Sequence, residues 1–510
     1  MRNGSVSHPT IPEHLRRVAE SNPASPALTD PVGEVSHAEL AAQTESTARA
    51  FRALDLSPGA RVGLALEPSI PYVIAVLGAM AAGLTPVLMN TRLAPPETAA
   101  FLRPLSADLI VHDTAHAGWA AEVRLDRLLM DATAEQASPR ARMAPLDGRG
   151  LTGPLPPVGA DAPALILPTG GTTGGPKGVW FDHAALWRGV AASAANLPRL
   201  PDDRDLYFAP FFHIMFPAQL LYSLFTGGHT EILPVFDAGR ALDAIARGAT
   251  RLGGAPTLMA RLRRHPDFER VPRERITQIL YGSAPSSTEF VESLVRDYPN
   301  ARIHSLYGAT EYGGPVTSIR HEDLLAGRQQ GVGRCWPGQQ VRVVDDLGNP
   351  CPPGTTGYFS VRSLGQANGY WGLPQATEAA FRPEGVRVGD MGRTDGEGWF
   401  RLDGRDSEMI VTGGENVFPS EVEQVLHQHA SVRDALVFGV PDDDWGARVE
   451  ALVVPEPGAA LVTEELLSFA RARIARYKLP KHIQAVDALP LTANSKPDRA
   501  AAIRLVSQPG

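Results

Sequence analysis

The sequence predicts an α/β fold with largely parallel strands, followed by a smaller α+β unit. Helical patterns alternate with short β-rich runs from Ile11 onward, which is typical of parallel sheets covered by helices. After Gly357 the chain changes to short β runs with frequent glycine and aspartate. We therefore expect two domains, residues 1–406 and residues 407–510, because 510 residues are enough to bury more than one core.

Local signals mark the first elements of the N-terminal part. Ser36 is a suitable N-cap for a helix over residues 38–54, and Glu39, three residues later, completes a capping-box pattern. A turn and a strand over residues 61–66 follow this helix. The expected order is therefore helix and then strand, as the alternation requires.

Residues 70–89 imitate a membrane span, because they contain no charged residue and are about as long as a bilayer crossing requires. Prolines and glycines interrupt this stretch. The pattern fits better as a buried helix over residues 71–82, a stop at Gly83 and a buried strand over residues 85–89. We predict a core helix of a soluble protein here.

A glycine-rich stretch, Thr169–Gly178, reads TGGTTGGPKG and follows an apolar, strand-like run over residues 164–167. Glycine lets backbone N–H groups approach an anion, and threonine hydroxyls and one lysine add donors, so the stretch predicts a polyphosphate-binding loop. It is not a Walker A loop, because Pro176 precedes Lys177 and no serine or threonine follows. A flexible surface turn is the alternative.

Two further stretches are candidate walls of a site. Residues 206–216 are aromatic and aliphatic around His213, which indicates either a histidine satisfied within the core or an apolar pocket wall. Residues 279–285 and 303–311 are β-rich runs that end in small residues. Because ligands of open α/β sheets lie beyond the carboxyl ends of strands, these two ends can line one site; two ordinary turns are the alternative.

The C-terminal unit is expected to alternate helices and strands before a final lysine-bearing loop. Its predicted helices span residues 419–428 and 463–476, and its predicted strands span residues 435–440 and 447–454. This order describes a compact α+β unit.

Charge and cysteine content exclude several classes of function. Lysine and arginine number 48 against 56 acidic residues, a net charge of -8 with no long basic run, so no nucleic-acid partner is expected. Cys335 and Cys351 have no metal-binding spacing. The polar N-terminus lacks the apolar region of a signal peptide, and with two cysteines in the chain this points to the cytoplasm and to no disulfide.

Eight motifs over most of the chain resemble the acyl-adenylate-forming superfamily of acyl-CoA synthetases, adenylation domains and luciferases. In chain order they are TGGTTGGPKG, FFHIMF, YGSAP, YGATE, GDMGRTDGEGWF, GRDSEMIVTGGENVFPSEVE, GVPDDDWG and LPLTANSKPDR. The resemblance implies a large N-terminal domain of stacked α/β sheets with a β-barrel-like region, and a small α+β C-terminal lid that rotates. It also implies ATP, Mg²⁺ and coenzyme A, with an acyl-AMP intermediate.

The resemblance implies roles for the residues that match its motifs. The β- and γ-phosphates of ATP would be held by Thr169, Thr172, Thr173 and Lys177. The adenine would lie against Gly282, Ser283, Ala284 and the ring of Tyr307. Mg²⁺ would bind Glu311 and Thr169. Asp390 would accept the ribose hydroxyls with support from Arg405, unless Asp390 is an ordinary turn aspartate.

The catalytic candidates that the resemblance implies are Lys496, Thr310 and His213. Thr310 would contact the α-phosphate. Attack of a carboxylate on that phosphate brings two anions together, so fixed positive charge is needed where negative charge accumulates, and Lys496 would supply it. A solvated surface lysine is the alternative.

Coenzyme A would enter between the two domains when the lid rotates. The resemblance implies that Gly413 and Gly414 line the pantetheine tunnel and that Trp445 stacks on the adenine of coenzyme A. The phosphates of coenzyme A would meet Arg473, Arg476 or Lys478. A packing tryptophan and a solvated basic helix face are the alternative.

Two departures from the family pattern concern the lid and not ATP binding. Ser407 occupies the hinge position, where the family usually has aspartate or lysine, and Ser495 replaces the usual glycine before Lys496. They leave the second acceptor open between coenzyme A, a carrier-protein phosphopantetheine and a small nitrogen or oxygen nucleophile. A nucleotide-binding protein without turnover is the alternative from another class.

The acid substrate is expected to be aromatic or medium-chain and not an amino acid. Amino-acid-activating relatives place an aspartate near the FFHIMF position, whereas this chain has Phe212, His213 and Ile214 there. Burying an unpaired ammonium against such a surface would be costly. A homodimer is compatible with the sequence.

Overall fold

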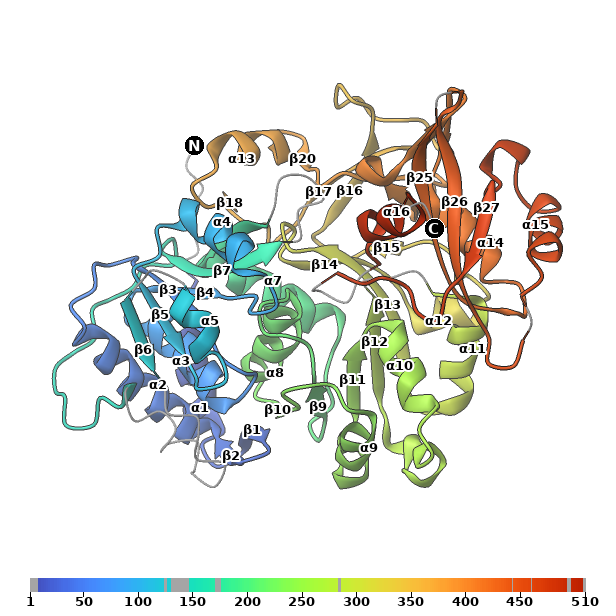
Figure 1. The fold of residues 1–510 in the computed structure, drawn as a ribbon. Helices are drawn as coiled ribbons and strands as arrows, with labels where there is room; N and C mark the ends of the chain where they lie inside the picture. The colour runs from blue at the N-terminus through green and yellow to red at the C-terminus, as the bar shows by residue number, and fades with distance from the viewer. Residues whose placement is uncertain are drawn as a thin grey trace.

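The computed structural model describes residues 8–122, 126–129, 146–169, 176–282, 286–442, 444–459, 461–492 and 497–507. Within these residues, two large sheets and a smaller C-terminal sheet organise the chain (Figure 1). The predicted α/β class with an additional small α+β unit is confirmed.

The seven-stranded sheet has the strand order β18-β8-β7-β4-β3-β5-β6, and the strands from β7 to β6 are parallel. Its strands are β3 Arg61–Ala65, β4 Thr85–Leu88, β5 Leu109–His112, β6 Asp126–Leu129, β7 Pro163–Thr169, β8 Lys177–Asp182 and β18 Gly369–Tyr370. The sheet's helices are α1 Ile11–Ser21, α2 His37–Arg52, α3 Ile70–Ala81, α4 Pro95–Leu105, α5 Ala117–Glu122 and α7 His183–Asn196.

The predicted starts and ends of the first elements are close to those observed. The capping box at the start of α2 is confirmed, because Ser36 Oγ accepts from the Glu39 N–H at 3.2 Å and the Ser36 N–H donates to Glu39 at 2.8 Å. The core helix predicted within residues 70–89 is also confirmed: the side chains of α3 are buried all round. None of the helices among the described residues is both long and apolar enough to cross a membrane.

The larger sheet has a parallel half and an antiparallel half. Strands β1, β10, β9, β11, β12 and β13 run parallel, and β14 begins the antiparallel half. The parallel half contains β1 Pro26–Asp30, β9 Arg204–Tyr207, β10 His229–Ile232, β11 Arg251–Gly254, β12 Gln278–Gly282 and β13 Arg302–Ala309, with β2 Gly33–Ser36 antiparallel at its edge. Its helices are α8 Tyr222–Phe225, α9 Ala238–Arg247, α10 Pro256–Arg263 and α11 Thr288–Asp297, and a π-helix spans Phe216–Leu221.

The antiparallel half follows residue 313 and so begins well before Gly357, where the sequence changes to short β runs. Its strands are β14 Gly314–Ile319, β15 Gly333–Cys335, β16 Gln340–Val344, β17 Gly357–Arg362, β19 Phe381–Arg382, β20 Gly385–Val386, β21 Asp390–Thr394 and β22 Trp399–Arg405. Two short helices accompany them, α12 His321–Leu325 and α13 Pro374–Ala380. Helices α7 and α8 lie between the two large sheets in Figure 1, and one apolar core joins α7, the π-helix and strands of both sheets.

The C-terminal unit, orange to red in Figure 1, contains the hairpin β23 Ile410–Thr412 and β24 Glu415–Val417 and a three-stranded sheet. That sheet consists of β25 Val432–Asp442, β26 Gly446–Pro455 and β27 His482–Ala485, with helices α14 Pro419–Leu426, α15 Thr463–Arg471 and α16 Arg499–Ser507. The apolar core clusters among the described residues separate between Leu402 and Ile410. The boundary at residues 406 and 407 stays a prediction.

The predicted helix over residues 463–476 is wrong at its end, because α15 stops at Arg471. The Lys478 ammonium donates to the Glu421 carboxylate of α14 at 2.6 Å, within a short 3₁₀ turn over Arg476–Lys478. This tertiary contact outweighs the helical propensity of the stretch, since propensity is a weak preference.

Candidate functional site

The two predicted strand ends lie side by side. Strands β12 and β13 are parallel neighbours with Gly282 opposite Leu306, so the segments after Gly282 and after Ala309 leave the same edge of the sheet. A Cβ on Gly282 would collide with the Leu306 carbonyl oxygen, which explains why glycine ends β12. Tyr307, one residue further along β13, is buried.

Glu311 lies in the turn after β13 and is almost fully buried, at 5% exposure. The Tyr370 hydroxyl of β18 donates to this carboxylate at 2.8 Å. Burial raises the pKa of Glu311, and the backbone hydrogen bond, the Tyr370 hydroxyl and Arg405 oppose that rise only in part. A cation bound here would offset the cost of burying the negative charge.

The glycine loop connects β7 and β8, whose register pairs Thr169 with Lys177. These two residues therefore lie opposite each other where the loop begins and ends. The Lys177 ammonium lies 5.0 Å from the ring centroid of Tyr370, within cation–π range. Tyr370 thus contacts both the lysine of the glycine loop and the carboxylate of Glu311, which lie far apart in the sequence.

Asp390 and Arg405 face each other on the antiparallel pair β21 and β22. The Arg405 Nε donates to Asp390 at 2.9 Å, and the Tyr307 hydroxyl donates to the other carboxylate oxygen at 2.7 Å. Burial alone would lower the pKa of Arg405, but the charges of Asp390 and Glu408 raise it above the usual value. The carboxylate of Asp390 is therefore a buried acceptor held from both sides, which a surface turn aspartate would not be.

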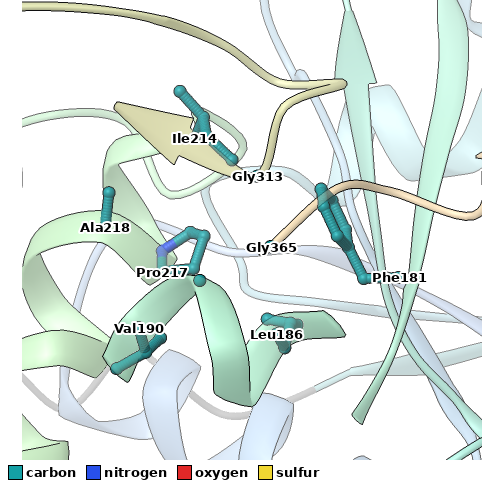
Figure 2. A pocket seen from close by; sticks show the side chains of 9 residues that line it. Phe181, Leu186, Val190, Ile214, Pro217, Ala218, Gly313 and Gly365 are labelled. Atoms are coloured by element: carbon teal, nitrogen blue, oxygen red, sulfur yellow. The ribbon is translucent and has the colours of Figure 1, made fainter. Parts of the chain in front are cut away.

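An apolar cavity adjoins this site (Figure 2). Its lining comes from β8, from α7, from the π-helix, from Ile214 and from two further glycines. In Figure 2, Gly313 lies near Ile214, and Gly365 lies between Pro217 and Phe181. Thr310 and Glu311 lie three and two residues before Gly313 in the chain, and His213 directly precedes Ile214. His213 is half-buried, and its Nδ1 accepts from the Met215 N–H at 3.3 Å. This contact fits a histidine that orders its own turn beside the cavity.

The residues predicted for coenzyme A form a separate group in the C-terminal unit. Gly413 and Gly414 make the turn of the β23–β24 hairpin, and a Cβ on Gly413 would lie 2.8 Å from the ring of Trp445. Trp445 is 48% exposed and lies under the Lys481 ammonium at 4.8 Å. An exposed ring beside a cation is available to a planar anionic ligand.

The predicted basic cluster is partly engaged within the protein. Lys478 binds Glu421, as described above, and the Arg473 guanidinium lies 3.6 Å from the ring centroid of Phe469. Ser407 is exposed in a short turn over Asp406–Glu408, and Glu408 in this turn pairs with Arg499 at 3.2 Å. These contacts tie the segment around the predicted hinge to α16.

Five predicted site residues lie outside the described residues: Thr172, Thr173, Ser283, Ala284 and Lys496. Sequence reasoning missed Tyr370, although the structure places it between two predicted site residues. Its only signal is an aromatic side chain in a Gly-Tyr-Trp run, and such a run is equally typical of core packing.

The donor set around Glu311 fits Mg²⁺ bound together with phosphates. Among the described residues no group of three or more His, Cys, Asp and Glu side chains could enclose a metal ion. Mg²⁺ is usually held by one or two carboxylates plus phosphate oxygens and water, so a single buried carboxylate beside a phosphate loop suits it.

Comparisons with known proteins agree with this geometry. Residues 15–371 match the family described as AMP-binding enzyme, and residues 421–496 match the AMP-binding enzyme C-terminal domain. A feruloyl-CoA synthase from an Amycolatopsis species is 32% identical over 94% of this chain and 96% of its own length. An indoleacetate–CoA ligase from Aromatoleum aromaticum is 33% identical, covering 95% of this chain and 96% of its own.

Solved structures of similar proteins share the whole fold. The o-succinylbenzoate CoA synthetase of Bacillus subtilis, in complex with its acyl-adenylate intermediate, superposes with a TM-score of 0.85 at 26% identity and covers 98% of both chains. The same enzyme has been solved with ATP and a magnesium ion. The amide bond synthetase McbA from Marinactinospora thermotolerans superposes with a TM-score of 0.86 at 26% identity, covering 97% of this chain and 99% of its own.

Proposed function

The chain belongs to the AMP-binding enzyme family and is an enzyme of the ligase class, and from this premise we propose that it converts a carboxylic acid and ATP to an acyl-AMP and then to an acyl-CoA. The observation that carries the proposal is the connected arrangement at the strand ends. Tyr370 joins Lys177 to Glu311, and Asp390 lies near them with Tyr307 and Arg405.

The geometry supports one binding mode for ATP. The β- and γ-phosphates lie at the glycine loop with Lys177, and the ribose hydroxyls donate to the Asp390 carboxylate, which Tyr307 and Arg405 hold in place. Glu311 would hold Mg²⁺, with the Thr169 hydroxyl as a further oxygen ligand. When bound, Mg²⁺ neutralises part of the charge on the phosphates.

Two substitutions at two different atoms make up the reaction. An oxygen of the acid's carboxylate attacks the α-phosphorus, a P–O bond forms, and pyrophosphate leaves, giving acyl-AMP. The thiolate of coenzyme A then attacks the acyl carbon, and AMP leaves. Thr310 orients the α-phosphate, and Lys496 supplies positive charge where the first step accumulates negative charge.

The acid is proposed to be aromatic or medium-chain and not an amino acid. The small cavity at Gly313, where the acyl group would enter, is lined by apolar side chains and glycines alone, so this lining offers an ammonium no partner. This lining supports an acyl group without charge.

Coenzyme A is the proposed acceptor, and the unit beyond residue 406 acts as the rotating lid that admits it. Gly413, Gly414 and the exposed ring of Trp445 would guide pantetheine and the adenine of coenzyme A. A nitrogen nucleophile is the second candidate, because the amide bond synthetase McbA shares the whole fold with this chain.

A panel of acids tests the proposal directly. AMP release is measured for aromatic and straight-chain acids, with and without coenzyme A, and the thioester is identified by mass spectrometry. We expect AMP release that depends on coenzyme A for at least one aromatic or medium-chain acid. Pyrophosphate exchange without any thioester would favour the second candidate, a nitrogen nucleophile, as the acceptor. Absence of exchange with every acid would reject adenylation.

Lys177→Ala should raise the KM for ATP and leave kcat much less affected. Lys177 binds the β- and γ-phosphates, which are distant from the reacting phosphorus. It therefore contributes the same binding energy in the ground state and in the transition state. The loss of one charge-assisted hydrogen bond corresponds to about a ten-fold increase in KM. Steady-state kinetics at saturating acid measure it, and a large fall in kcat with an unchanged KM would contradict the role.

Tyr370→Phe should increase the Mg²⁺ concentration that half-maximal activity requires by about ten-fold, as expected when a hydroxyl that orients a metal ligand is lost. The phenylalanine ring still lies beneath Lys177, so only the contact with Glu311 is removed. Calorimetric titration of MgATP into the variant gives a readout independent of turnover. Tyr298→Phe, in another buried core, is the matched control and should leave the Mg²⁺ dependence unchanged.

A further inference from the structure

An apolar groove lies on the opposite side of α7 from the cavity of Figure 2. Its volume is about 460 Å³, and its walls include Trp187, Ala191 and Ala195 of α7 together with Pro337 and Leu364. Helical periodicity turns these α7 residues away from Leu186 and Val190, which line the cavity. The groove is large enough for a small ligand group.

The cavity next to Glu311 is far smaller. Its volume is about 10 Å³, room for about one water molecule and not for an aromatic ring or an alkyl chain. An acyl group whose carboxylate lies at Thr310 therefore needs space beyond this cavity. The groove is the larger of these two spaces.

Three glycines from three segments separate the cavity from the groove. A Cβ on Gly365 would lie 2.5 Å from the Gly189 Cα, and a Cβ on Gly189 would lie 3.1 Å from the Gly313 carbonyl oxygen. Gly189 lies in the interior of α7, where glycine weakens a helix, so its presence fits a close backbone approach. Where these three glycines meet, the wall of the cavity is backbone without side chains.

Exposed hydrogen bonds hold the groove side of this wall at Leu364. Leu364, next to Gly365, donates its N–H to Gln339 at 3.0 Å and accepts from Arg188 Nε at 2.9 Å. Both bonds are exposed, and Leu364 itself is 41% exposed. Exposed hydrogen bonds exchange with water at small net cost. The segment is anchored on either side, because the Ser363 hydroxyl donates to the Tyr312 carbonyl at 2.6 Å and the Ala367 N–H donates to the Glu311 carbonyl at 3.1 Å.

We propose that the groove is the distal acyl subsite of this enzyme: the tail of the substrate passes between Gly189 and Gly365, displaces the Leu364–Gly365 segment and lies along α7. The preferred substrates are then acids with an elongated apolar tail, straight-chain or arylalkyl, in preference to compact acids. This inference rests on the proposed adenylation function and names its substrate class.

Two variants test the subsite with a series of acids from butanoic to hexadecanoic acid, assayed by ATP–pyrophosphate exchange. Ala195→Trp fills the groove at an exposed position distant from the reacting atoms, and Gly189→Ala thickens the wall. In each variant the ratio of kcat/KM for dodecanoic acid to that for butanoic acid should fall by about ten-fold or more, the scale of losing apolar contacts in a pocket. Ala53→Trp, an exposed alanine at the end of α2, should leave this ratio unchanged.

The outcomes separate the two proposals. A ratio that stays at the wild-type value in both variants, or a wild-type preference for the short acids, overturns the groove as a subsite while adenylation stands. Absence of exchange with every acid rejects the adenylation function, and the subsite with it. Melting temperatures measured for each variant separate a selective loss from unfolding, and Ala195→Trp keeps the test valid if Gly189→Ala does not fold.

Discussion

Replacing Lys496 by alanine should lower the rate of acyl-adenylate formation by roughly 10²- to 10³-fold, the usual cost of losing one preorganised charge donor. The carboxylate and the α-phosphate are both anions, so their approach depends on positive charge that is in place before the reaction. The effect should appear mainly in kcat, because charge develops at this atom only as the reaction proceeds.

The second half-reaction gives this prediction its control. Acyl-AMP supplied from outside should still react with coenzyme A in Lys496→Ala, since the thioester step forms no new bond to the α-phosphorus. Pyrophosphate exchange measures the first step and thioester formation measures the second. Equal losses in both steps would show that Lys496 organises the fold or the lid and does not act on the α-phosphate. Lys177→Ala, with its main effect on the KM for ATP, provides the contrast.

Much of the fold followed from local sequence signals. The capping box at Ser36 and Glu39 specifies the start of α2, because both partners of each hydrogen bond lie within one turn. The buried helix α3 could be distinguished from a membrane span by the prolines and glycines within residues 70–89. Such signals involve residues a few positions apart, and no knowledge of the tertiary structure is required.

The candidate site could be predicted in part, because its motifs are short and each carries its own chemistry. The contact of Tyr370 with Glu311 could not, because it joins residues 59 positions apart through the pairing of β18 with β8. The end of α15 was mispredicted for a similar reason, since the contact of Lys478 with Glu421 of α14 is tertiary. The glycine contact between α7 and the segments at Gly313 and Gly365 also depends on the packing of distant segments.

Asp390→Asn should lower kcat/KM for ATP by roughly 10²- to 10³-fold, because a charged acceptor for the ribose hydroxyls is lost and the Arg405 guanidinium loses its carboxylate partner. Asparagine has nearly the same shape, so Tyr307 keeps an acceptor for its hydroxyl. The change therefore removes charge and leaves most of the packing intact.

A nucleotide that lacks a ribose hydroxyl tests whether Asp390 contacts the ribose or only supports the structure around Arg405. The wild-type enzyme should discriminate strongly against 2′-deoxy-ATP and 3′-deoxy-ATP, since a buried acceptor is left unpaired when the hydroxyl is missing. If Asp390 accepts from the ribose, Asp390→Asn should lose most of that discrimination, because the two changes remove the same interaction. Unchanged discrimination would make Asp390 a structural partner of Arg405 alone.

A second ion pair between β21 and β22, Asp403 with Arg393, controls for the general effect of removing a charge from these two strands. Asp403 accepts from Arg393 at 2.9 Å and, like Asp390 and Arg405, joins β22 to β21. Asp403→Asn should lower the melting temperature by no more than Asp390→Asn does, because Arg393 is more exposed than Arg405. It should leave the discrimination between ATP and its deoxy analogues unchanged. Loss of discrimination in Asp390→Asn alone would therefore assign the ribose contact to the carboxylate that Tyr307 and Arg405 hold in place.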